Sequence, residues 1–107
     1  MKITTKKTLD VTASLEIYIE EKLGSIGKMV ASYEKDGDAE LRVEVARTTQ
    51  HHKKGDEVFF ASADLRLPGK VLRCEASASD IRKAIDEVRD MLHGEVEKYK
   101  AKHSHGR

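Results

Sequence analysis

The chain has 107 residues, of which 38% are hydrophobic and 36% are charged, so it has room for one domain. This composition is too apolar for a disordered segment and too polar for a membrane protein, and no apolar run is long enough to span a bilayer. One cysteine, together with an N-terminus that has no apolar signal segment, predicts a cytoplasmic protein without disulfides. A large multilayer enzyme is excluded, whereas a small binding module is not.

Two elements are expected in the first third of the chain. Residues 3–7 are rich in threonine and predict a short strand. A helix should follow, with Thr12 as the N-cap and Glu16 in the first turn. Its apolar residues recur at steps of three and four and form one face: Leu15, Ile19, Leu23, Ile26 and Val30. Gly24 and Gly27 weaken the second half of this helix.

From residue 39 the pattern changes to a period of two, which predicts strands. The inward row of the first strand is Leu41, Val43 and Val45. Residues 48–56 are polar and predict a loop, and a second strand begins at Val58 and ends at a type II turn made by Pro68 and Gly69.

A third strand over residues 70–76 and a long helix complete the chain. Ser77 or Ser79 is expected to cap the helix, with Asp80 near its positive end. An apolar stripe then continues to about residue 100.

This order predicts an α+β fold, a two-layer βαβββα sandwich whose four-stranded sheet carries both helices on one face. The helices have one apolar face each, so they should cover the same side of the sheet. The opposite face, with Arg42, Arg66 and Arg73, is expected to be open to water or a partner.

No motif of a catalytic or nucleotide-binding site occurs in the chain, so we expect no enzyme, cofactor or small-molecule substrate. Cys74 lies on the inward phase of its strand, which indicates a core residue rather than a nucleophile. The histidine pairs His51–His52 and His103–His105 lack further ligands at zinc spacing, so no metal site is expected.

The remaining indication of function is the position of the basic residues along the helices. Four basic residues share a strip roughly 40° wide beside the apolar stripe of the last helix: Arg82, Arg89, His93 and Lys100. Asp86 and Asp90 are expected to form solvated pairs with Arg82 and Arg89. On the first helix, Lys22 should pack its stem at the edge of the apolar face and extend its ammonium into water.

Further basic residues could extend this surface toward a polyphosphate: Lys6, Lys7, Lys28, residues 51–54 and the C-terminal segment. Residues 98–107 contain no acidic side chain. They fit a phosphate-seeking arm, and they equally fit a helix end whose lysines and histidines complement the helix dipole. The few aromatics form no cluster for stacking bases, so any RNA binding should involve phosphates and shape rather than base sequence.

Several segments together resemble a known family. They are residues 9–23 with Ile26 and Lys28, residues 64–76 around Leu67-Pro68-Gly69-Lys70, and the groups 79–80, 84–86 and 98–100. The chain resembles the ribosome hibernation promoting factors, also called the ribosome-associated inhibitor or sigma-54 modulation family, over nearly its whole length. The resemblance implies the same βαβββα fold, similar to double-stranded-RNA-binding domains.

The resemblance also implies a function that is not enzymatic. Such a protein binds the small ribosomal subunit (30S) and its rRNA, also within the 70S ribosome, at the decoding channel. There it blocks mRNA and tRNA, inhibits translation and preserves idle ribosomes under stress or in stationary phase. Residues 1–101 are expected to be a single ribosome-binding domain and residues 102–107 a short basic tail, as in a short form without the C-terminal domain of long members.

Two groups of cations make up the expected rRNA-binding set. The first stands where family members usually carry basic residues: Lys22, Lys28, Lys98 and Lys100. The second is expected to replace, on a shifted track, the basic residues lost at Met91 and Gly94: Arg82, Lys83 and Arg89. Two alternatives remain open, a protein-interaction module that modulates a transcription factor and a shape-specific RNA binder without ribosome preference.

Overall fold

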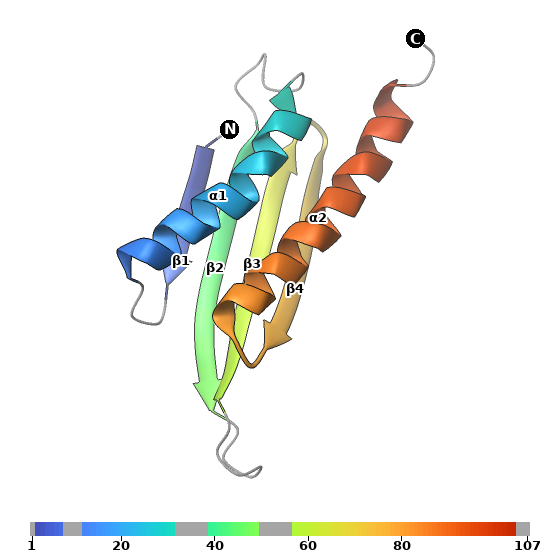
Figure 1. Ribbon diagram of the computed structural model, residues 1–107. Coiled ribbons are helices and arrows are strands. Elements are labelled where there is room, and N and C mark those ends of the chain that lie inside the picture. The colour runs from blue at the N-terminus through green and yellow to red at the C-terminus, as the bar shows by residue number, and fades with distance from the viewer. Residues whose placement is uncertain (1, 8–11, 32–38, 50–56, 105–107) are drawn as a thin grey trace.

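The computed structural model describes residues 2–7, 12–31, 39–49 and 57–104 (Figure 1). The elements are β1 (Lys2–Lys7), α1 (Ala13–Met29), β2 (Glu40–Thr49), β3 (Glu57–Leu67), β4 (Lys70–Ala78) and α2 (Ile81–Ser104). The strands form one sheet in the order β1-β2-β3-β4. The expected α+β order and the four-stranded sheet are confirmed.

The sheet is mixed because β1 and β2 are parallel, whereas β2, β3 and β4 are antiparallel to their neighbours. Parallel neighbours need a crossover connection, and α1 provides it. Both helices lie on one face of the sheet (Figure 1). The predicted two-layer arrangement is therefore correct.

The core lies between the helices and this face of the sheet. The apolar stripe expected for α1 is buried in full, and α2 buries its own stripe from Ala84 to Tyr99. The strands contribute every second residue, as their alternation predicted: Leu41, Val43, Val45, Ala61, Ala63, Leu65, Leu67, Leu72 and Cys74. Cys74 is a buried core residue, as expected.

Local signals placed one helix start and one turn correctly. The Thr12 hydroxyl accepts a hydrogen bond from the Leu15 backbone N–H at 3.2 Å, so Thr12 caps α1. Gly69 has a φ of 75°, the positive value that a type II turn after Pro68 requires.

Four expected boundaries were wrong: the ends of β2, β4 and α2, and the cap of α2. β2 continues to Thr49, because Thr48 and Thr49 pair with Val58 and Glu57 and the ladder outweighs their polarity. Ser77 lies within β4, which extends to Ala78, and Ser79 lies one residue before the cap, so neither serine caps α2.

The cap of α2 is Asp80 instead. Its Oδ1 accepts a hydrogen bond from the Arg82 N–H at 2.9 Å, and its carbonyl oxygen accepts one from the Ala84 N–H at 3.1 Å. α2 also runs to Ser104 rather than ending near residue 100, so residues 102–104 of the expected tail are helical. In the described part of the chain, no helix has both the length and the hydropathy needed to cross a bilayer.

Candidate nucleic-acid interface

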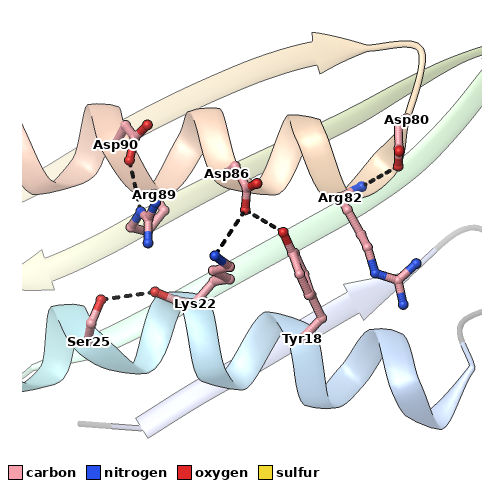
Figure 2. A network of polar contacts seen from close by, with 8 residues as sticks. All are labelled: Tyr18, Lys22, Ser25, Asp80, Arg82, Asp86, Arg89 and Asp90. Carbon is pink, nitrogen blue, oxygen red and sulfur yellow. Dashed lines mark hydrogen bonds and ion pairs between the residues drawn. The ribbon is translucent and has the colours of Figure 1, made fainter.

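The two helices meet along a polar border, which we call the seam (Figure 2). It consists of Tyr18 and Lys22 from α1 and Arg82, Asp86 and Arg89 from α2. Each helix supplies these residues one turn apart, so they lie on its side facing the other helix. Three of the seven cations expected to bind rRNA therefore come together here.

A carboxylate at the centre of the seam ties the helices together. The Tyr18 hydroxyl donates a hydrogen bond to Asp86 Oδ1 at 2.7 Å, and Lys22 Nζ lies 4.0 Å from the same oxygen. The hydrogen bond to Asp86 and partial burial raise the pKa of Tyr18, because a phenolate beside this carboxylate is unfavourable. Asp86 was expected to pair with Arg82 on its own helix, but Tyr18 and Lys22, the residues that contact it here, belong to α1.

The ring of Tyr18 holds two cations. The Arg82 guanidinium lies 5.2 Å from the ring centroid and the Lys22 ammonium 5.5 Å, both within the range of a cation–π interaction. Arg82 also donates from Nη2 to Ser14 Oγ at 3.2 Å. Among the described residues no carboxylate pairs with this guanidinium, so most of its donors can serve a phosphate.

Arg89 extends the seam along α2. Its Nε donates to Asp90 Oδ1 at 2.9 Å, which confirms the expected Arg89–Asp90 pair. His93 follows one turn later and lies 3.9 Å from Glu97. Arg89 and His93 therefore lie beside carboxylates, and Arg82 is the cation of this edge that has no carboxylate partner among the described residues.

The other expected rRNA-binding residues are more dispersed. Lys28 and Lys83 are exposed and have no carboxylate partner within the described residues. Lys100 is half-buried on α2. Lys98 lies on the opposite edge of α2, beside β4, and pairs with Glu95 at 3.7 Å.

Two expected extensions of the basic surface do not join it. Lys6 lines a hollow on the open face of the sheet together with Arg42, so it points away from the helices, which corrects the expectation of one shared surface. Residues 51–54 and the side chain of Lys7 lie outside the described residues.

The open face of the sheet is charged but balanced. Arg42, Arg66 and Arg73 are exposed there, as expected. Arg73 donates to Asp64 at 2.8 Å and pairs with Glu75 at 2.9 Å, and Arg42 lies 3.6 Å from Glu40. Arg42 and Arg73 are each already close to a carboxylate, so these two arginines offer a phosphate less than Arg82 does.

No chemistry of another kind competes with the seam. Within the described residues, no three side chains among His, Cys, Asp and Glu gather as a metal site would require. Burial raises the pKa of the Cys74 thiol, which keeps it protonated and unreactive at neutral pH.

The roles of Tyr18 and Asp86 were missed at the level of sequence. Tyr18 was interpreted as a residue at the edge of the core, and it does pack against the core. The signal that could have found its second role is spacing, since Tyr18–Lys22 and Arg82–Asp86 are both i,i+4 pairs. Their contact across the helices depends on the packing of α1 against α2.

The fold and the seam define a small α+β domain that presents cations between two helices on one side of a four-stranded sheet. The family model described as "Sigma 54 modulation protein / S30EA ribosomal protein" matches residues 1–104, and the chain belongs to this family. The resemblance seen in the sequence is thereby confirmed. Membership also confirms that the chain is not an enzyme, since the description names a modulation protein and a ribosomal protein.

Individual proteins agree with this assignment. The chain is 26% identical over 97 residues to a ribosome hibernation promotion factor of Deinococcus radiodurans, covering 91% of this chain and 47% of that protein. The chain thus spans about half the length of this relative. The N-terminal domain of Protein Y from Thermus thermophilus has a TM-score of 0.67 and 25% identity, with 92% of this chain and 99% of that chain covered.

A ribosomal subunit interface protein from Coxiella burnetii has a TM-score of 0.72. Its identity is 22%, and the alignment covers 94% of this chain and 99% of that chain. At this identity the likeness concerns the fold, which both molecules share.

Proposed function

We propose that this chain is a cytoplasmic ribosome hibernation factor. It binds the small ribosomal subunit (30S) and its rRNA, free or within the 70S ribosome, at the decoding channel. In that position it excludes mRNA and tRNA and keeps idle ribosomes intact under stress. Family membership and the named function of the Deinococcus radiodurans relative support the proposal.

The observation that carries it is the seam, where Arg82 has no carboxylate partner among the described residues and shares the Tyr18 ring with Lys22. Basic side chains that neutralise rRNA phosphates release condensed counterions, and this release drives binding. The Tyr18 ring holds both cations in place before binding, so less side-chain entropy is lost on contact.

The remaining cations take part around the seam. Lys28, Lys83 and Lys100 on the helix layer, and Lys98 on its far edge, would contact further phosphates. Residues 1–101 act as the ribosome-binding domain, and the basic residues that follow, of which 102–104 belong to α2, extend its charge. Because the contacts are to phosphates, recognition follows the shape of the rRNA rather than a base sequence.

Ribosome co-sedimentation with matched variants tests the seam. Replacing the three cations of the seam, Lys22, Arg82 and Arg89, together with glutamine should sharply reduce pelleting with 30S and 70S particles at low salt. The control replaces the same number of cations on the open sheet face, Lys6, Arg42 and Arg66, and should pellet like the unmodified chain. Thermal melting of both variants checks that each is folded.

In vitro translation provides the functional readout. The unmodified chain should inhibit translation in proportion to its occupancy of ribosomes, and the seam variant should not. Pelleting of the seam variant at the level of the control would refute the seam as the rRNA contact. If the unmodified chain does not bind ribosomes but binds duplex RNA, the molecule is instead a shape-specific RNA binder. If it binds neither ribosomes nor duplex RNA, it is a protein-interaction module.

A further inference from the structure

A second surface lies on the other side of α2, where this helix borders the outer strand β4. β4 ends the strand order of the sheet, and no described strand pairs with its outer side. In an edge strand, about half of the backbone N–H and C=O groups face away from the neighbouring strand. β4 can therefore accept a further strand by main-chain hydrogen bonds.

Two hollows follow this border between β4 and α2, with volumes of about 420 and 380 Å³. Glu95 and Lys98 line both, so the hollows form one continuous groove, called here the β4–α2 groove. Leu72 and Tyr99 line the first hollow. Cys74 lines the second, with Met91, which is 41% exposed.

The spacing of the hollows matches that of a strand. Leu72 and Cys74 are two residues apart on β4, and both are buried on the side that faces α2. Alternate side chains of an extended peptide point to the same face. A peptide paired with β4 would therefore place residues i and i+2 beside Leu72 and Cys74, one in each hollow. Strand addition with pockets for alternate side chains is an established mode of peptide recognition.

The charge of the groove indicates the chemistry of the peptide. Lys70 and Lys102 line the Leu72 end, and neither has a carboxylate partner among the described residues. At the Cys74 end, Glu75 already pairs with Arg73 at 2.9 Å, and Asp90 pairs with Arg89 at the same distance. The uncompensated charge is therefore positive and lies at one end.

This charge disfavours a second copy of the chain as the occupant. Its own edge strand would bring Lys70 and Arg73 against a single acidic residue, Glu75, and so would add positive charge to a groove that already has an excess. An acidic segment fits better, because its carboxylates would meet Lys70 and Lys102 while its apolar side chains enter the hollows.

We propose that the β4–α2 groove binds an extended acidic peptide of another protein. The peptide adds to β4 as a further strand and buries two apolar side chains, two residues apart, against Leu72 and Cys74. Its carboxylates pair with Lys70 and Lys102. This site is separate from the seam, although Lys98, which lines both hollows, also belongs to the proposed rRNA-binding set.

Fluorescence anisotropy tests the proposal with a labelled synthetic peptide that carries two leucines two residues apart and aspartates on one side. The full chain should bind it saturably, and binding should protect β4 amides from hydrogen exchange. A peptide of the same composition with adjacent leucines should bind far more weakly. Equal binding of the two peptides would overturn the proposal.

Two variants examine the groove itself. A Cβ at Gly94, which lines the second hollow, would meet nothing within 4 Å. Gly94→Leu should therefore fill the hollow and abolish peptide binding, whereas Gly94→Ala should leave binding unchanged. Retained binding by a folded Gly94→Leu variant would contradict the proposal.

Charge variants test the proposed pairing of Lys70 and Lys102 with the carboxylates of the peptide, independently of Gly94→Leu. Lys70→Glu with Lys102→Glu should weaken peptide binding about tenfold, and a peptide with lysines in place of aspartates should regain it. The matched control, Lys28→Glu with Lys83→Glu, should bind normally. Displacement of the bound peptide by a short uridylate oligonucleotide would instead assign the groove to RNA. Concentration-dependent dimers in gel filtration that Gly94→Leu abolishes would assign it to a second copy.

Discussion

The Tyr18 hydroxyl and the Asp86 carboxylate are 68 residues apart in the chain, and they meet at 2.7 Å between the helices. This contact does two things at once. It joins α1 to α2, and through the ring of Tyr18 it holds Lys22 and Arg82 in place. A single tyrosine therefore links the stability of the helix layer to the arrangement of its cations.

Removing the Tyr18 hydroxyl should cost about 0.5–1 kcal/mol of the free energy of unfolding, since a hydrogen bond to a partly hydrated carboxylate contributes modestly. Tyr18→Phe keeps the ring, so the cation–π contacts persist. Urea denaturation of Tyr18→Phe, Asp86→Ala and the double variant should give less than additive losses. Fully additive losses would show that the two groups do not interact.

Cys74 should make the free energy of unfolding depend on pH under alkaline conditions. Burial raises its pKa in the folded state. As the pH rises past the ordinary thiol pKa of about 8.5, the unfolded chain therefore loses its proton first. Below that pH the thiol is protonated in both states and does not change the free energy of unfolding with pH. Above it the free energy of unfolding should fall. Melting curves between about pH 7.5 and 9.5 should show this decline, and Cys74→Ala should remove its thiol component.

At the scale of elements, Gly94 lowers the stability of α2, and a substitution there can restore it. Glycine in a helix interior costs about 0.5–1 kcal/mol relative to alanine, and a Cβ at Gly94 meets nothing within 4 Å. Gly94→Ala should therefore raise the melting temperature by about 3–6 °C.

Gly69 provides the opposite case for the same substitution. Its φ of 75° is unfavourable for a residue with a Cβ, so Gly69→Ala should lower the melting temperature. Calorimetry on both variants checks the pair of signs. A higher melting temperature for both variants would mean that the turn tolerates a Cβ at Gly69, and that the backbone conformation there does not determine the effect of the substitution.

Across the whole molecule, the two layers divide the charge unequally. On the open sheet face Arg42 and Arg73 pair with carboxylates, whereas the seam leaves Arg82 without a carboxylate partner in the described region. The molecule therefore has one side better suited to phosphates, although its net charge is only +1.

Ribosome binding should consequently weaken steeply with salt. A plot of log affinity against log salt should be linear, and Arg82→Gln should reduce its slope by about one, as expected for one lost phosphate contact. Arg66→Gln on the open face should leave the slope unchanged. Filter binding to 30S particles at several salt concentrations measures both slopes, and an unchanged slope for Arg82→Gln would exclude a phosphate contact there.

Most of the fold was predictable from local pattern. The stripe from Leu15 to Val30 and the alternation around Leu41 and Leu72 correspond to the buried faces, because burial follows the periods of helix and strand. Boundaries were less accurate. β4 extends to Ala78 because it pairs with Phe59 on β3, and that pairing left Asp80 as the cap of α2.

The candidate site was predictable only in part. Helical spacing indicated that Arg82 and Arg89 share an edge of α2, and that Lys22 borders the apolar face of α1. It did not identify Lys22 as the partner of Asp86. The family resemblance grouped Lys98 with cations that lie across the helix from it.

Residue order alone established the number and kind of elements, the buried faces and the absence of catalytic motifs, because each depends on neighbours a few positions apart. Packing established the rest: the Tyr18–Asp86 contact, the separation of Lys6 from the helix layer and the groove beside β4. These features depend on which elements pack against one another. The periodicity within one element indicates which of its faces is buried, but not which residues of another element that face contacts.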